Sequence, residues 1–372
     1  GYIMKHKTLL FLIFGLIIMG VMLWFIGIDE VFNALRMSNI LYVILAILIE
    51  IVVYALYTLR WEIINKIVGI DADFNDLFPM VMLSLAVNNI TPSGRGGGEP
   101  VRAYVLTKES NIPFESTFAT VIADRAFDTF PFILLAILTL ILVIFNYSLA
   151  PWIIACLIIA VVAVIIVVTA IVYMSINESF GVKVTNALVW LLHKVSKKNT
   201  EEREMRLIEA VDGFQDTMRL TVSNRKLTLY ALPLSLLIWI LEISRVCVVF
   251  MAFGYPVSPL IIAESFILSV LIGFIPILPG GVGLIDGTMI LLFASAGIPS
   301  GISAAATVVE RLISYWMTTF LGLLTIPKYG INVLDNITGP KEEPKSVVNN
   351  RNLSEVNHAV DNIKKLHENT KK

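Results

Sequence analysis

Apolar runs long enough to cross a bilayer recur along this chain, and they restrict its folds more than any other feature. The first extends from Thr8 to Ile28 and the second from Ile40 to Leu59. About 20 consecutive apolar residues suffice for a transmembrane helix. Of the 372 residues, 57% are hydrophobic and 15% are charged, whereas soluble proteins are about 25% charged. The sequence therefore predicts an all-α polytopic membrane protein.

The apolar segments fall into two kinds by length. About six runs match the length that a full membrane span requires. These runs are Thr8–Ile28, Ile40–Leu59, Pro113–Phe145, Pro151–Met174, Leu227–Phe253 and Ser300–Ile326. The shorter pieces 77–90 and 284–297 are typical of re-entrant helices, and with their neighbours they predict two broken helix pairs. We interpret Arg60-Trp61-Glu62, at the end of the second run, as an anchor at the membrane interface.

Basic residues gather in the polar segments, and this predicts an orientation. Residues 175–226 form a polar loop in which Glu201–Arg219 has apolar residues near helical spacing, typical of an amphipathic helix on the membrane surface. Residues 335–372 form a mixed-charge tail that we expect to be disordered, which leaves residues 1–334 as the membrane domain. Because segments rich in Lys and Arg stay cytoplasmic, we expect both termini on the cytoplasmic side of the cell membrane.

Two Gly/Pro-rich breaks interrupt the apolar sequence, and an acid–Arg pair follows each of them. The first break lies within residues 88–102 and precedes Asp124-Arg125. The second lies within residues 275–286 and precedes Glu310-Arg311. Each acid stands eleven residues after a proline, so the two stretches align with an offset of 186 residues.

This alignment predicts an internal repeat. We interpret residues 40–145 and 227–327 as its two halves. An odd number of membrane crossings between the halves would place them in opposite orientation. That arrangement is the inverted-repeat plan of secondary transporters, whose broken helices meet near the middle of the membrane.

The two acid–Arg pairs and Asp128 place charges inside expected membrane helices, at Asp124, Arg125, Asp128, Glu310 and Arg311. Each would cost about 2.5–3.5 kcal/mol at the bilayer centre if it faced lipid. We therefore expect them to face protein or a wet cavity, with an ion pair between Arg125 and Asp128 one helical turn apart. Two interpretations stay open: clamps between helices, or a cavity between the two halves that binds a charged group.

The glycines within 94–98 also allow two interpretations. They can let helices approach closely, as small residues do in membranes. Alternatively, Arg95 and Arg102 flank a helix start near Glu99-Pro100, and a helix N-terminus with two arginines suits a phosphate. The second break, at Pro279-Gly280-Gly281, has no arginine nearby. The two halves are therefore expected to contact a headgroup differently.

These motifs resemble the flippase-type transmembrane domain of lysylphosphatidylglycerol synthases. The resemblance rests on residues 88–102, Asp124-Arg125, Pro279–Gly283 and Glu310-Arg311, and it covers roughly residues 5–330. It implies a helical bundle with re-entrant segments that moves a lipid between leaflets.

The chain departs from that family pattern in two places. The synthases carry a soluble aminoacyl-transferase domain after the membrane part, whereas here a short polar tail follows, so we expect no synthesis of aminoacylated lipid. Asp286 stands where the resemblance implies a Glu after the second break, which gives a shorter arm for the same charge.

We therefore expect a lipid transporter, or flippase, for an anionic or phosphate-linked lipid such as a phospholipid or a polyprenyl-phosphate carrier. An ion-coupled solute transporter and a membrane-embedded lipid transferase are the alternatives. We expect no enzymatic role, metal, cofactor or nucleic-acid partner. Membrane lipids are the expected partners, and a homo-oligomer and a separate lipid-modifying enzyme are left open. The expected substrate-binding residues are Arg95, Gly97, Gly98, Glu99, Arg102, Asp124, Arg125, Asp128, Pro279, Gly280, Gly281, Gly283, Asp286, Glu310 and Arg311.

Overall fold

The computed structural model describes residues 27–91, 97–146, 150–196, 200–273 and 283–329, together with a few single positions between 13 and 24. Within these residues the chain is helical and has no strand. Helices suit an apolar solvent because they satisfy every backbone hydrogen bond within one segment. The predicted tail, 335–372, lies outside the described residues, and most of the predicted first run, Thr8–Ile28, does too.

Four of the described helices are long and apolar enough to cross a membrane. They are α3 (Ile40–Val68), α6 (Phe114–Asn146), α7 (Pro151–Ile176) and α10 (Arg225–Ala252). Their positions agree with four of the predicted runs, and the predicted all-α polytopic membrane fold is confirmed. The chain is a multi-pass membrane protein.

The last predicted run is a helix with an irregular middle. The segments α13 (Ser300–Arg311), η2 (Leu312–Met317) and α14 (Thr318–Leu323) follow one another directly, and η2 is a π-helix. A π-helical turn holds an extra residue and is frequently found at functional sites. Here it begins immediately after Glu310-Arg311.

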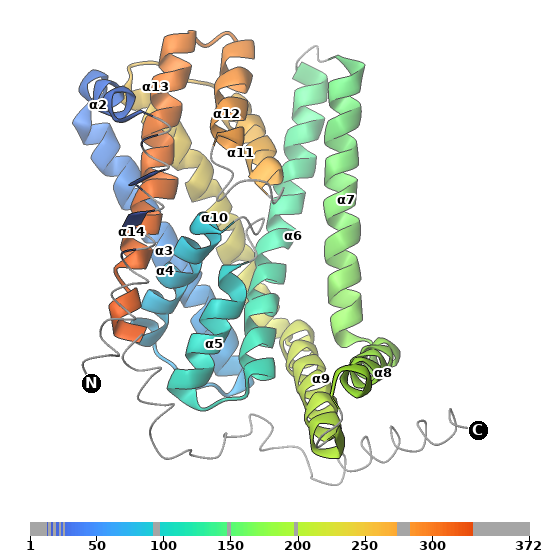
Figure 1. The fold of residues 1–372 in the computed structure, drawn as a ribbon. Coiled ribbons are helices and arrows are strands. Elements are labelled where there is room, and N and C mark those ends of the chain that lie inside the picture. Colours follow the sequence, from blue (N-terminus) through green and yellow to red (C-terminus); the bar gives the residue numbers. More distant parts are fainter. Residues whose placement is uncertain are drawn as a thin grey trace.

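Two helix hairpins occupy opposite halves of the bundle (Figure 1). One consists of α4 (Phe74–Ile90) and α5 (Gly98–Ser110), in the lower half of the view. The other consists of α11 (Pro259–Gly273) and α12 (Leu284–Ser295), in the upper half. Each of these helices is shorter than a full span. The breaks in the sequence therefore separate short helices that pack against each other, α4 against α5 and α11 against α12.

The two long helices α3 and α10 pack against each other at the centre of the bundle. They are antiparallel, because the N–H of Asn39, just before α3, donates to the carbonyl of Ala252 at the end of α10 at 2.7 Å. The apolar core is built around this pair. One part lies between α10, α11, α12 and α13, and another lies between α3, α4 and α5.

The remaining helices lie at the ends and edge of the bundle (Figure 1). Helix α2 (Ile28–Met37) lies at the upper end. Helices α8 (Glu178–Val195) and α9 (Thr200–Ser223) lie at the lower end, below α7. Helix α9 agrees with the predicted amphipathic helix and packs against α6 and α8. Its contact with a membrane surface stays a prediction.

Glycine lets two helices approach α4 closely, which gives a prediction for stability. A Cβ on Gly322 would lie 2.2 Å from the carbonyl oxygen of Met82, and one on Gly98 would lie 2.0 Å from that of Ser84. Backbone atoms cannot yield as a flexible side chain can. We therefore expect Gly322→Ala and Gly98→Ala each to destabilise the fold by about 1–3 kcal/mol. Thermal unfolding in detergent would measure this loss.

The matched control is Gly287→Ala within α12, where no heavy atom lies within 4 Å of the added Cβ. Alanine favours helix more than glycine does, so this variant should melt at or slightly above the wild-type temperature. An equal loss in all three variants would show that the close approach is not the cause.

Candidate functional site

A cavity of about 170 Å³ lies at the centre of the bundle, where both hairpins meet the long helices. Its charged lining consists of five arginines and five carboxylates. They are Arg60, Arg102, Arg125, Arg245 and Arg311, and Glu50, Glu99, Asp124, Glu242 and Glu310. All of these residues except Arg125 are buried. Charges in such surroundings are stable only when they are paired, so their pairing describes the site.

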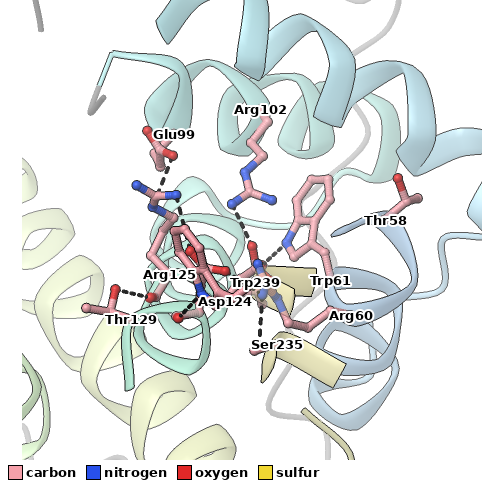
Figure 2. A network of polar contacts seen from close by, with 12 residues as sticks. Thr58, Arg60, Trp61, Glu99, Arg102, Asp124, Arg125, Thr129, Ser235 and Trp239 are labelled. Carbon is pink, nitrogen blue, oxygen red and sulfur yellow. Dashed lines mark hydrogen bonds and ion pairs between the residues drawn. The ribbon is translucent and has the colours of Figure 1, made fainter. Parts of the chain in front are cut away.

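The first group of charges is the Arg60 cluster, which joins α3, α5 and α6 (Figure 2). Its members are Arg60, Arg102, Arg125, Glu99, Asp124 and Asp128. Asp124 is at its centre. Its Oδ1 accepts from Arg60 Nε at 2.6 Å and its Oδ2 accepts from Arg102 Nη2 at 2.9 Å. Both carboxylate oxygens of this buried residue are therefore engaged by arginines.

Two tryptophans, Trp61 and Trp239, lie beside this cluster (Figure 2). The guanidinium of Arg102 lies over the ring of Trp61 at 4.7 Å. The Trp61 indole N–H donates to Thr120 at 3.1 Å, and the Trp239 indole N–H donates to the carbonyl of Asp128 at 2.9 Å. A cation over an aromatic face gains further electrostatic attraction when water is excluded. Hydrogen-bonded tryptophans from α3 and α10 thus border the Arg60 cluster.

One sequence interpretation is wrong at this point. Arg60-Trp61-Glu62 is not an interfacial anchor, because α3 continues to Val68 and Arg60 is only 2% exposed. Arg60 Nη1 donates to Asp128 Oδ1 at 2.8 Å. Asp124 and Asp128 lie on the same face of their helix. Two acids on one face could have indicated that an arginine from another helix pairs with them, in addition to Arg125. The sequence did not say which helix supplies it.

Arg125 is the exception among the cavity arginines. Its side chain is 32% exposed, and its Nε lies 3.4 Å from Glu99 Oε1. Its Nη1 lies 3.8 Å from Asp128 Oδ2, at the predicted spacing of three residues. These contacts are longer than those of Arg60. Arg125 therefore reaches the cavity with the weakest hold on its carboxylates.

The second group is the Arg245 cluster, which consists of Arg245, Glu50, Glu242 and Glu310. Nη1 of Arg245 contacts both Glu50 and, at 2.5 Å, Glu242 Oε2. Nη2 donates to Glu310 Oε1 at 2.7 Å. One buried guanidinium is thus shared by three buried carboxylates from α3, α10 and α13.

Glu50, Glu242 and Arg245 were not among the predicted site residues. Glu50 is isolated in one apolar run, and Glu242 and Arg245 lie three residues apart in another, all away from the Gly/Pro breaks. A lone ionisable residue in a predicted span is by itself a sign of function, and that signal could have found all three. Only the fold could show that they meet.

Arg311 connects the second hairpin to the first. Its Nε donates to Asp286 Oδ1 at 2.9 Å, and its guanidinium lies over the ring of Tyr315 at 4.7 Å. The Tyr315 hydroxyl donates to the carbonyl of Asn89 at 2.6 Å, near the end of α4. The π-helical segment is thereby tied to the tip region of the α4–α5 hairpin.

The ion pairs repeat between the two aligned stretches. In each stretch, an arginine of the long central helix, α3 or α10, forms an ion pair with the acid of the acid–Arg pair. The arginine of the acid–Arg pair in turn forms an ion pair with an acid near the start of α5 or α12. The first pairing is Arg60–Asp124 and Arg245–Glu310, and the second is Arg125–Glu99 and Arg311–Asp286. By its contact Asp286 is the counterpart of Glu99, although its side chain is shorter and it lies 187 residues after Glu99, one more than the offset of 186 between the acid–Arg pairs.

The glycines beside the breaks have local roles. Gly98 lies against α4, and its N–H donates to Asn88 Oδ1 at 2.7 Å. This contact agrees with the interpretation of close helix approach at that residue. Gly283 has φ +83°, a conformation that favours glycine, and its N–H donates to Asp286 Oδ2 at 2.8 Å. Gly283 thus helps to orient the carboxylate that holds Arg311.

Four predicted site residues, Arg95, Pro279, Gly280 and Gly281, lie outside the described residues. Gly97 is the residue before α5. The structure brings together around one cavity the predicted Glu99, Arg102, Asp124, Arg125, Glu310 and Arg311. Asp128 and Asp286 stand behind them as ion-pair partners. In the described part of the chain no group of His, Cys, Asp and Glu has the arrangement of a metal site.

Comparison with known proteins agrees with these motifs. Residues 12–322 match the family described as the lysylphosphatidylglycerol synthase TM region. A UPF0104 membrane protein of Methanothermobacter thermautotrophicus is 46% identical over 334 residues, which cover 90% of this chain and 99% of that protein. Another, from Methanocaldococcus jannaschii, is 31% identical over 86% of this chain and 94% of its own length. A third, from Pyrococcus horikoshii, is 28% identical over 87% of this chain and 97% of its own.

The family match includes both hairpins, both acid–Arg pairs and the central helices that supply Arg60 and Arg245. The relatives align over nearly their whole length, so the similarity concerns the entire bundle. The chain therefore belongs to the family of the lysylphosphatidylglycerol synthase transmembrane region, together with the UPF0104 membrane proteins.

Proposed function

We propose that this protein is a lipid transporter, or flippase, which moves an anionic or phosphate-linked lipid between the leaflets of the cell membrane. A phospholipid or a polyprenyl-phosphate carrier has the required chemistry. The headgroup would enter the charged cavity while the tails stay in the bilayer. In this proposal the chain is a carrier and not an enzyme, and its partners are membrane lipids.

The observation that supports this function most is the accessibility of Arg125. Its side chain is 32% exposed, whereas Arg60 and Arg245 are 2% and 1% exposed. A guanidinium can bind phosphate through two parallel hydrogen bonds. Arg125 can turn toward such a ligand without breaking a short buried ion pair. The two fully buried arginines cannot, because their carboxylates would be left uncompensated.

An inverted repeat would let the cavity open to either side in turn. The two hairpins lie in opposite halves of the bundle and their long helices are antiparallel (Figure 1). In secondary transporters, rocking of one repeat against the other gives access alternately from each side. We propose the same plan here, with the hairpins as re-entrant gates. On this plan the loop 175–226 and both termini are cytoplasmic.

The test is mass spectrometry of the lipids that remain bound to the purified protein. We expect one phosphate-bearing lipid to be enriched in the wild type and reduced at least tenfold in Arg125→Gln and Arg311→Gln, because each change removes a donor at the cavity. Both variants should still elute as folded, monodisperse protein. Arg206→Gln on α9 is the matched control, since the side chain of Arg206 is 73% exposed and its ion pair in the described part of the chain is with the exposed Glu202.

Two results would contradict the proposal. If the wild type and all three variants carried lipids in the proportions of the bulk membrane, no specific headgroup would be bound. That result would favour an ion-coupled solute transporter. Loss of the folded protein in both cavity variants would instead favour arginines that act as clamps between helices.

A further inference from the structure

The Arg245 cluster holds more negative charge than its one arginine can compensate. Three carboxylates, Glu50, Glu242 and Glu310, contact a single guanidinium, and all three residues are buried. The Arg60 cluster, by contrast, has three arginines for three acids. If all three glutamates were ionised, the Arg245 cluster would carry two excess negative charges in a region buried from bulk solvent. Such an excess is costly.

The geometry places two of these carboxylates beside each other. Glu50 and Glu242 both contact the same atom, Nη1 of Arg245, whereas Glu310 has Nη2 to itself. Two carboxylates that share one site do not both ionise readily, and one of them retains a proton. The arrangement therefore identifies the Glu50–Glu242 pair as the place where a proton would be held.

Other charges of the cavity do not remove the excess. In the described residues every remaining cavity arginine pairs with an acid outside the cluster: Arg60 and Arg102 share Asp124, Arg125 pairs with Glu99 and Arg311 pairs with Asp286. The other titratable side chains of the lining are Tyr54, Tyr57 and Tyr315.

The helices around the cluster add no cation to it either. The lining residues from α4, α11, α12 and α14 are uncharged. On α2 the residues Asp29, Glu30 and Arg36 are exposed, and on α9 Arg219 pairs with Asp216 at 3.1 Å.

A second observation connects the cluster with water. Nε of Arg245 is buried and has no hydrogen-bond partner among the described residues, and the same holds for the hydroxyl of Thr307, one turn before Glu310 on α13. Buried donors of this kind are normally satisfied by ordered water. The adjoining cavity of about 170 Å³ is lined by Glu50, Glu242, Arg245 and Glu310, and it has ample volume for several water molecules. Protons can therefore reach the carboxylates.

We propose that the Arg245 cluster is a proton-binding site, in which a carboxylate of the Glu50–Glu242 pair takes a proton from cavity water and returns it there. The proton converts that carboxylate to a carboxylic acid and lowers the excess charge of the cluster by one. A coupling of transport to a proton gradient follows from this site, and that coupling rests on the proposed lipid transport. The π-helical segment η2 directly follows Glu310-Arg311, so a change of charge in the cluster occurs beside an irregular helical segment.

The experiment is infrared spectroscopy of the purified protein at neutral pH, which detects the carbonyl band of a protonated carboxylic acid and requires no lipid substrate. We expect such a band in the wild type, with a shift in D₂O because the cavity exposes the group to exchange. In Glu50→Gln and in Glu242→Gln the band should lose at least half its intensity, because the remaining pair of carboxylates no longer competes for one nitrogen.

The control variant is Glu264→Gln. Glu264 lies in α11 and lines a separate apolar groove between α6, α7 and α11, so a band that belongs to the Arg245 cluster must persist there. Absence of the band from the wild type, or its loss only in Glu264→Gln, would overturn the proposal. Failure of both Glu50→Gln and Glu242→Gln to fold would overturn it as well, since it would mean that each carboxylate is needed in its charged form.

Reconstitution into vesicles then separates the two proposals. If the infrared band is present and changes in the variants as expected, but no lipid moves in the vesicles, proton binding is supported and the transport function is contradicted. Lipid movement that a pH gradient accelerates in the wild type, and does not accelerate in Glu242→Gln, supports both. Lipid movement without the infrared band supports transport and contradicts the proton site.

Discussion

Replacement of Arg245 by methionine is expected to cost more stability than any other single change in this protein. The substitution removes the only guanidinium that contacts Glu50, Glu242 and Glu310 in the described residues. Removal of one partner of a buried ion pair typically costs about 3–5 kcal/mol, because the other charge stays buried without compensation. Here three carboxyl groups lose their partner together. We expect little or no monodisperse protein after detergent extraction, measured by size-exclusion chromatography.

A rescue variant separates electrostatics from lost packing. Arg245→Met combined with Glu50→Gln, Glu242→Gln and Glu310→Gln removes the carboxylates together with the cation. This combination should recover most of the folded protein, since replacing a whole buried ionic group by neutral residues is often close to neutral for stability. A single Arg245→Met variant that melts within about a degree of the wild type would contradict the assigned ion pairs.

Replacement of Arg60 by methionine is expected to have the second largest effect. Asp124 would keep Arg102 at 2.9 Å, but Asp128 would retain only Arg125, whose nearest nitrogen lies 3.8 Å away. Ser235, which accepts from Arg60 Nη1 at 2.9 Å, would lose that donor too. We expect a loss of about 3–5 kcal/mol, smaller than for Arg245→Met because one aspartate stays paired. Thermal unfolding in detergent would show which of the two variants, Arg60→Met or Arg245→Met, is less stable.

The companion variant for this cluster is Asp128→Asn. Added to Arg60→Met, it neutralises the carboxylate that loses most, so the double variant should melt above Arg60→Met alone. If Asp128→Asn lowered the melting temperature further, the two residues would not act as a pair. A larger loss in Arg60→Met than in Arg245→Met would contradict the difference in charge compensation between the two clusters.

Several features of the fold could be predicted from local sequence. The starts of α6, α7 and α10 lie within two residues of the predicted ones, because an apolar run and its proline or polar flanks determine a membrane helix without outside help. The expected ion pair between Arg125 and Asp128 is confirmed, since residues three apart on a helix are neighbours in any fold. The predicted end of the second run, Leu59, was wrong, because α3 continues to Val68. The prediction took Arg60 for a charge at the membrane interface.

The site itself was predictable only in part. Residues beside the Gly/Pro breaks and in the acid–Arg pairs were identified, since charges after a helix break are conspicuous in an apolar chain. Glu50, Glu242 and Arg245 were missed because nothing in their immediate neighbours distinguishes them. Their significance depends on contacts with residues up to 195 positions away.

The sequence by itself determined that this chain forms membrane helices, where two of them break, and that a set of charges must be kept away from lipid. These properties follow from the free energy of transferring each segment into an apolar solvent, which depends on the segment alone. Only the tertiary structure decided which arginine meets which carboxylate, and that one cluster is balanced while the other carries excess negative charge. Pairing of buried charges depends on which helix faces pack together, and in this protein the central pair α3 and α10 brings both clusters to one cavity.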